Sequence, residues 1–294
     1  VDVTSATSCI ESSGRSIALY LNVIRIIYGI PSIVISIILT IIIFTRRRPE
    51  YSGFFYQSFA CALCLACPYI ALSAGHIAIF NSELCPTIRP YAMTPSRWMI
   101  PLMICVPFTI FVQLLFIMLQ VLHRFTILFK PAFFPKIWER FKSAVIISAL
   151  LLTVAVNSPI FPSSAYMTAA YDYYSVSYDH YVPWFSTTLL GLISAAVFGT
   201  LITILNTMAI IALRITTKSR IRDVESRLII VGTTQSVFAF AALLLEIYIH
   251  YLAYVLSDLS NYAPASHALN FLLDGVSFGG VYALLATSVN IRLD

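Results

Sequence analysis

The stretch MIPLMICVPFTIFVQLLFIMLQVLHRFTILFKPAFFPKIWERFK, residues 99–142, combines the two signals that decide the fold. No residue between 99 and 122 is charged. A bilayer core about 30 Å thick requires roughly 20 such residues of helix, because unsatisfied backbone groups cannot remain in hydrocarbon. The remainder is basic and aromatic, and its basic side chains include Arg124, Lys130, Lys136, Arg140 and Lys142. This order predicts a membrane span that ends at a basic loop.

The apolar character of residues 99–122 is shared by the chain as a whole. Hydrophobic residues make up 59% of it and charged residues 11%, against about 45–50% and about 25% in soluble proteins. Helices of soluble proteins also show one polar face, which these apolar runs lack. Seven runs are long enough to span a bilayer, at about 20–44, 54–80, 99–122, 143–162, 184–213, 228–256 and 268–289. The predicted fold class is an all-α membrane protein with a seven-transmembrane helix bundle.

The Lys and Arg residues lie mostly on one side of these spans, and short basic loops stay cytoplasmic. Three lie in loop 45–53, five in loop 123–142, five in loop 214–227 and one at Arg292, which places 14 of the 18 on one side. The amino terminus is therefore predicted to lie outside. The predicted divisions are an extracellular segment, the transmembrane domain and the start of a cytoplasmic tail, at 1–19, 20–289 and 290–294.

Polar side chains inside the predicted spans mark candidate functional positions, because they are costly in lipid and usually face the bundle. They are Gln113, Asn157, Asn206, Gln235, Glu246, His250 and Asp274. Glu246 and His250 share a helix face near the outer boundary, four residues apart. They are either pocket groups or interfacial residues that reach water. We take Gln113, Glu246, His250 and Asp274 as ligand-binding candidates.

The cysteines divide by position. Four lie inside predicted spans, at Cys61, Cys64, Cys67 and Cys105. We interpret these as small buried hydrophobes, because no His or further Cys completes a metal site on the second helix. Cys9 and Cys85 fall in exterior, oxidising segments, where either a disulfide between them or two free thiols fit. We expect no metal, no cofactor and no nucleic-acid partner.

The second outer loop, residues 163–183, is rich in tyrosine. Its tyrosines are Tyr166, Tyr171, Tyr173, Tyr174, Tyr178 and Tyr181. Tyr suits membrane interfaces, so the loop is either an aromatic belt at headgroup level or a lid. Partial alternation in YDYYSVSYDHYV, residues 171–182, favours a hairpin over a pocket, with Tyr173 and Tyr174 as ligand-binding candidates. The loop has no Lys or Arg, which disfavours a strongly acidic ligand there.

Four pieces of the sequence resemble the nematode serpentine chemoreceptors of the Srg type and their close relatives of the Srv type. They are YGIPS at 28–32, TRRRPEYSGFFYQSF in the first loop, HRFTILFKP from His123, and FPKIWERF before the fourth span. In that family the third span typically ends in Asn-Arg-Phe-Thr, followed by a Phe/Pro-rich loop and Lys-Ile-Trp. Here His123 replaces the Asn. The resemblance covers about the first 160 residues in the right order.

This resemblance implies a seven-helix receptor of the G-protein-coupled type in the plasma membrane, in sensory neurons or their cilia. A small odorant or pheromone-like ligand would enter an outer pocket. The inner ends of the third, fifth and sixth helices would open toward a G protein, with Arg124 in the place of the Arg of the inner third-helix motif. The G-protein-facing candidates are His123, Arg124, Lys130, Lys136, Arg220 and Arg222. A simpler interpretation leaves the basic residues only a role in orientation and contact with anionic lipid.

Arg25 and Asp274 lie at similar depths in the first and seventh spans. Arg25 is roughly 7–8 Å from the outer end and Asp274 roughly 9 Å, at about 1.5 Å per residue. Those helices are neighbours in a seven-helix ring of the receptor type, so an ion pair would relieve the cost of both charges. Alternatively, Arg25 extends to the headgroups while Asp274 faces a watery pocket as the counter-ion of a ligand.

Several features limit what the resemblance implies about function and leave one other class of membrane protein open. No acidic residue precedes Arg124, the sixth span has no Pro, and the seventh lacks Asn-Pro-x-x-Tyr. G-protein coupling therefore rests on resemblance alone. The seventh span has no Lys for a retinal Schiff base, and the chain has no convincing Ser/His/Asp set, so we expect no pump of that type and no enzyme. A transporter or ligand-gated channel remains the alternative, although the sequence shows no internal repeat.

Overall fold

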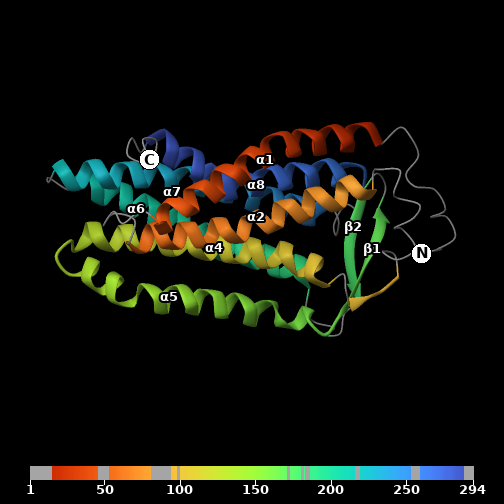
Figure 1. The fold of residues 1–294 in the computed structure, drawn as a ribbon, viewed down its shortest axis with the longest axis horizontal. Helices are drawn as coiled ribbons and strands as arrows, with labels where there is room; N and C mark the ends of the chain where they lie inside the picture. The colour runs from red at the N-terminus through yellow and green to blue at the C-terminus, as the bar shows by residue number, and fades with distance from the viewer. Residues whose placement is uncertain are drawn as a thin grey trace.

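Seven long helices run side by side in the computed structural model and form one bundle (Figure 1). The structure describes residues 15–45, 53–80, 94–97, 100–170, 173–179, 182, 186–215, 219–252 and 259–287. The helices are α1 (Arg15–Thr45), α2 (Phe54–Phe80), α4 (Ile100–Phe129), α5 (Phe134–Asn157), α6 (Thr187–Ile215), α7 (Ser219–Tyr251) and α8 (Leu259–Thr287). Each predicted span coincides with one of these helices, so the predicted fold class is confirmed.

Most helices that follow one another in the chain are neighbours in space, and α1 also packs on α8. The exception is α6, which packs on α4 and α7 rather than on α5. α4 is central, because it contacts α2, α5, α6, α7 and α8. By contrast α5 lies at one edge, where it packs on α4 and α2 (Figure 1). This arrangement places α4 inside the bundle and leaves one side of α5 on the outside of the bundle.

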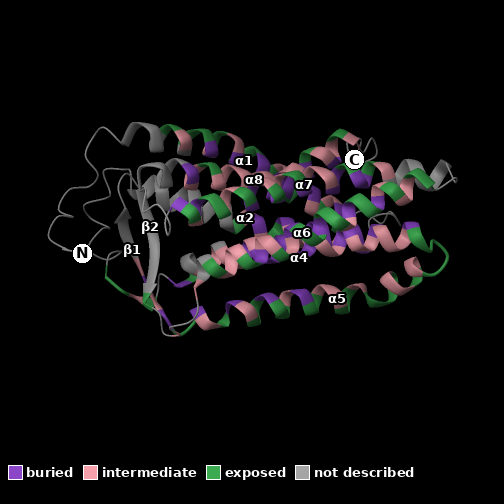
Figure 2. Cartoon of the chain, turned by 180° about the vertical axis from the view of Figure 1, so that it is seen from behind, coloured by how far each residue is buried: buried purple, intermediate pink, exposed green. Residues whose placement is uncertain are grey.

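Exposed residues lie along the outer faces of the helices (Figure 2). Many of them are large and apolar, as expected of helices that face lipid. Ile27, Leu151 and Val237 are each more than 60% exposed. Six of the described helices contain apolar spans of 23–27 residues, long enough to cross a membrane, and α2 contributes the shorter apolar segment Phe54–Pro68. The multi-pass membrane character of the chain follows from these helices.

The cytoplasmic ends differ from the predicted loops. α4 continues to Phe129 and α5 begins at Phe134, so most of the predicted loop 123–142 is helix. Pro135 stands in the first turn of α5, where a missing backbone N–H costs nothing. The predicted loop 214–227 is likewise mostly helix, because α7 begins at Ser219. Many of the basic residues assigned to these loops therefore lie on helices.

The second outer loop forms the predicted hairpin. Strands β1 (Ser164–Ala170) and β2 (Tyr173–Asp179) are antiparallel, and Tyr173 and Tyr174 pair with Ala170 and Ala169 in backbone register. The backbone of Ala165 also exchanges two hydrogen bonds, of 2.9 and 3.1 Å, with Ser96, just before α4. The hairpin therefore lies across one end of the bundle, anchored to the outer end of α4 (Figure 1).

Candidate functional site

An aromatic cluster joins the inner ends of α2, α4 and α5. The ring centroid of Trp138 lies 4.6 Å from that of Phe54 and 5.2 Å from that of His123, and the Phe54 and His123 centroids are 5.3 Å apart. Trp138 Nε1 donates a 2.9 Å hydrogen bond to Thr126 Oγ1. Three of the sequence pieces that carry the resemblance meet in this cluster, which explains why they occur together.

Arg124 lies next to this cluster and is buried, with 1% of its side chain exposed. Its guanidinium carbon stands 4.1 Å from the ring centroid of Phe55, a cation–π contact. A Cβ added to Gly232 would lie 3.0 Å from Arg124 Nη1 and 3.6 Å from Asn206 Oδ1. Because Gly232 has no side chain, it provides the space in which side chains of α4, α6 and α7 meet.

Buried amide side chains continue from Arg124 toward the middle of the bundle. Gln113 and Gln120 lie seven residues apart, and Gln120 precedes Arg124 by four, so all three share one face of α4. Gln113 Oε1 accepts a 2.7 Å hydrogen bond from Ser277 on α8. On α6 and α7, Asn206 Nδ2 donates a 3.0 Å hydrogen bond to Thr233 Oγ1. The interior is thus polar from the inner end to mid-bundle.

Arg25 and Asp274 form the predicted ion pair, between α1 and α8. Arg25 Nε lies 2.6 Å from Asp274 Oδ2 and Arg25 Nη2 lies 2.7 Å from Oδ1. The two side chains are 3% and 2% exposed. Tyr28 also donates its hydroxyl to Asp274 Oδ2. The alternative in which Arg25 extends to the headgroups is therefore wrong, and the Asp274 carboxylate is held by α1.

The YGIPS segment extends this network along α1. Ser32 Oγ lies 2.8 Å from Tyr282 Oη on α8 and donates to the Tyr28 carbonyl oxygen at 2.7 Å. The YGIPS motif by itself predicts no role for Tyr28, although Tyr28 follows Arg25 by three residues on the same helix face. Tyr28 and Ser32 thus explain this piece of the resemblance as a polar joint between α1 and α8.

The ligand-binding candidates fall into two groups. Gln113 on α4 contacts Ser277, which follows Asp274 by three residues on α8. Gln113 and Asp274 therefore lie near the same turn of α8. Glu246 and His250 belong to α7, and a Cβ added to Gly191 of α6 would lie 3.6 Å from Glu246 Oε1. Glu246 therefore lies against α6, whereas Gln113 and Asp274 lie toward α8.

The remaining candidates are placed as follows. Lys130 and Lys136 are exposed at the turn between α4 and α5. Arg220 and Arg222 lie in the first turns of α7, but their side chains are outside the described set, as are those of Tyr173 and Tyr174. Cys9 and Cys85 lie outside the described residues, so their disulfide stays a prediction. Within the described part of the chain, no group of three or more His, Cys, Asp or Glu side chains is placed to hold a metal ion.

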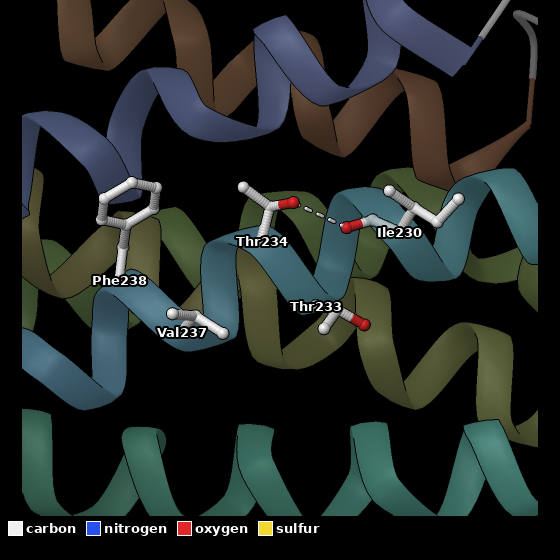
Figure 3. Close-up of a pocket in the computed structure, with 5 residues that line it drawn as sticks. All are labelled: Ile230, Thr233, Thr234, Val237 and Phe238. Atoms are coloured by element: carbon white, nitrogen blue, oxygen red, sulfur yellow. Dashed lines mark hydrogen bonds between the residues drawn. The ribbon is translucent and has the colours of Figure 1, made fainter.

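A groove of about 360 Å³ along α7 opens on the outside of the bundle (Figure 3). Its lining is Ile230, Thr233, Thr234, Val237 and Phe238. The hydroxyls of both threonines donate to backbone carbonyl oxygens of α7 itself. Because Ile230 and Val237 are exposed to the surroundings of the bundle, this groove is not the predicted outer pocket.

Phe238 also shows why α7 and α8 pack closely. A Cβ added to Gly275 would lie 2.4 Å from Phe238 Cδ1, and one added to Gly279 would lie 3.0 Å from Phe238 Cε2. The two glycines, one helical turn apart on α8, therefore form a notch that receives the Phe238 ring.

Comparison with known proteins agrees with this architecture. The chain is 25% identical over 264 residues to serpentine receptor class gamma-13 of Caenorhabditis elegans, covering 87% of this chain and 76% of that protein. It is 23% identical over 271 residues to serpentine receptor class gamma-14 of the same organism, covering 91% and 81%. The profile of the Srg family of chemoreceptors matches residues 22–294. The chain that carries the buried Arg124 and the Arg25–Asp274 joint is therefore a member of the Srg chemoreceptor family.

Proposed function

We propose that this receptor binds a small external ligand in the outer half of the bundle and signals to a heterotrimeric G protein at the inner ends of α4, α6 and α7. The observation that carries the proposal is the burial of Arg124 where these three helices meet. A permanently charged guanidinium is costly in an apolar interior, so its retention there supports a role beyond packing.

The inner half supports a switch that exposes Arg124. In this structure its guanidinium lies on the Phe55 ring, and Gly232 leaves room for it. Separation of α7 from α4 would open this space to the cytoplasm, since Gly232 belongs to α7 and Arg124 to α4. Lys130, Arg220 and Arg222 would then flank the opening and contact the G protein.

The outer half supports the ligand site. At about 1.5 Å per residue, Gln113 lies roughly 9 Å from Pro107, where the span of α4 begins, and Asp274 roughly 14 Å from Ala265. Both therefore lie within the half of the bundle that the hairpin crosses. We propose Gln113 and Asp274 as its polar groups and Tyr173 and Tyr174 as part of the lid, with Glu246 and His250 as a second polar group between α6 and α7.

We also propose that the receptor resides in the plasma membrane of chemosensory neurons or their cilia. Its support is the family of the relatives, together with the outside position predicted for the amino terminus. Expression of a tagged receptor from its own promoter would test this location, and confinement of the tag to internal membranes would contradict it.

Arg124→Ala tests the switch. We expect this variant to lose most ligand-evoked G-protein activation while its surface expression stays within about twofold of wild type, because the lost side chain contacts the moving helices. Arg140→Ala is the matched control, since Arg140 carries the same charge on the same side of the membrane but is exposed on α5. Equal signalling by wild type and Arg124→Ala at equal surface expression would contradict the switch.

A further inference from the structure

Basic and aromatic side chains gather at the cytoplasmic end of α5, on the outside of the bundle. Lys136, Arg140 and Phe141 are exposed on the helix, and Phe133 is exposed just before it. We call Phe133, Lys136, Arg140 and Phe141 the α5 inner corner. Its position matters because α5 packs only on one side, against α4 and α2 (Figure 2).

The two basic residues stand on the lipid-facing stripe of α5. Lys136, Arg140, Ile147, Leu151 and Val154 follow one another at steps of four, seven, four and three residues, so they share one face of a helix. The three apolar members are 54%, 65% and 42% exposed. The buried residues of α5 lie on its opposite side, and they are Ala149, Thr153 and Asn157. The basic residues therefore continue a surface that lipid covers.

The depth of the corner corresponds to the headgroup layer. The apolar span of α5 ends at Ile160 on the outer side. A hydrocarbon core of about 30 Å, or roughly 20 residues of helix, measured inward from that residue reaches Arg140. Lys136 then lies about 6 Å further, within the polar interface. Both side chains are thus at the level of inner-leaflet phosphates.

The charge of the corner is not cancelled by its own helix. Glu139 is the acidic residue of the stretch 123–157. Its Oε1 lies 2.5 Å from Lys142 Nζ, so that pair is internally neutral. Lys136 and Arg140 remain as a positive pair, and the Arg140 guanidinium carbon lies 5.7 Å from the Phe141 ring centroid.

We propose that the α5 inner corner binds the headgroup of an anionic phospholipid of the inner leaflet. Arg140 and Lys136 donate hydrogen bonds to its phosphate and meet its net negative charge, which zwitterionic lipids lack. Phe141 lies beside Arg140 at the boundary between headgroups and acyl chains, where aromatic rings are favoured, and Phe133 lies farther out, in the headgroup layer. Lys136 therefore contacts lipid rather than the G protein.

Trp138 offers an internal probe for this proposal, because it lies between Lys136 and Arg140 in sequence and is fixed by Phe54 and Thr126. The experiment uses a receptor with the other two tryptophans replaced, Trp98→Phe and Trp184→Phe. It is reconstituted in phosphatidylcholine vesicles that contain either brominated phosphatidylserine or brominated phosphatidylcholine. Bromine quenching of Trp138 fluorescence then gives the relative affinity for the two lipids.

We expect brominated phosphatidylserine to quench Trp138 at lower mole fractions than brominated phosphatidylcholine. Lys136→Gln with Arg140→Gln should reduce this preference by at least about fivefold, the effect of one basic side chain near an anionic surface. The matched control, Arg214→Gln with Arg227→Gln, removes two exposed charges from α6 and α7 and should retain the preference. In the unsubstituted corner, 1 M NaCl should also abolish the preference, a test that needs no variant.

Equal quenching by the two lipids would overturn the proposal. So would an equal loss in both double variants, because the effect would then be one of total charge. A third contrary result is a Lys136→Gln, Arg140→Gln receptor that keeps its lipid preference but loses G-protein activation, which would assign the corner to the G protein.

Discussion

At the scale of single residues, the buried charges between α1 and α8 are held by protein partners rather than by water. Arg25 and Asp274 meet in a two-bond arrangement that Tyr28 completes. Each charge alone would cost up to about 2.5–3.5 kcal/mol at the bilayer centre on insertion scales, and less near the interface. The sequence indicated the pair through depth alone, whereas Tyr28 could not be assigned, because a tyrosine inside a span carries no charge that demands a partner.

His123 stands at the position where the motif that this sequence resembles has Asn. His123 packs its ring against both Phe54 and Trp138. An Asn side chain has no ring to offer these neighbours.

The ion pair predicts an asymmetry between single and double substitutions. Arg25→Met or Asp274→Leu alone leaves one buried charge without its partner, which should lower the free energy of unfolding by about 3–5 kcal/mol. Arg25→Met with Asp274→Leu removes both charges and should recover most of this loss. Thermal unfolding of the purified receptor, alongside its surface expression, measures the difference. A double variant no more stable than the worse single variant would show that the pair is not the source of stability.

At the scale of helices, hydropathy predicted where each helix lies but not which way it faces. Lipid and protein interior are both apolar, so Leu151 on the outside and Val112 on the inside look alike in sequence. Polar residues and glycines carry the missing information, because Gln113, Arg124 and Asp274 must face the bundle and Gly275 must admit a neighbour. The sequence also did not indicate that helix continues through much of the two basic stretches 123–142 and 214–227, because basic residues are compatible with a helix as well as with a loop.

The packing of α7 on α8 predicts a graded response to added methyl groups. Gly275→Ala places a Cβ about where the Phe238 ring lies, at 2.4 Å, and overpacking of this kind typically costs about 1–3 kcal/mol. Gly279→Ala, with 3.0 Å to the same ring, should cost less. Thermal unfolding of the two variants gives the order, and Phe238→Ala should make the Gly275→Ala change milder. The reverse order, or no rescue, would contradict the close packing of these helices.

At the scale of the whole molecule, the bundle has two polar regions, to which the proposed function gives different roles. The outer region contains the α1–α8 joint under the hairpin, and the inner region contains Arg124 among α4, α6 and α7. Gln113 and Gln120 lie between them on one face of α4, so a movement of α4 against α7 and α8 would reach both regions. This geometry accounts for a receptor in which a ligand outside changes a surface inside.

The most direct test of this account is whether the receptor activates a G protein without itself conducting ions. Cells expressing it would be exposed to a panel of small volatile and water-soluble organic compounds, with energy transfer between Gα and Gβγ as the readout. Membrane current would be recorded in parallel in cells that lack heterotrimeric G proteins. The account predicts compound-evoked separation of Gα from Gβγ that requires Arg124, and no current in the second cells. A compound-evoked current without G proteins, together with unchanged energy transfer, would contradict it and identify a ligand-gated channel.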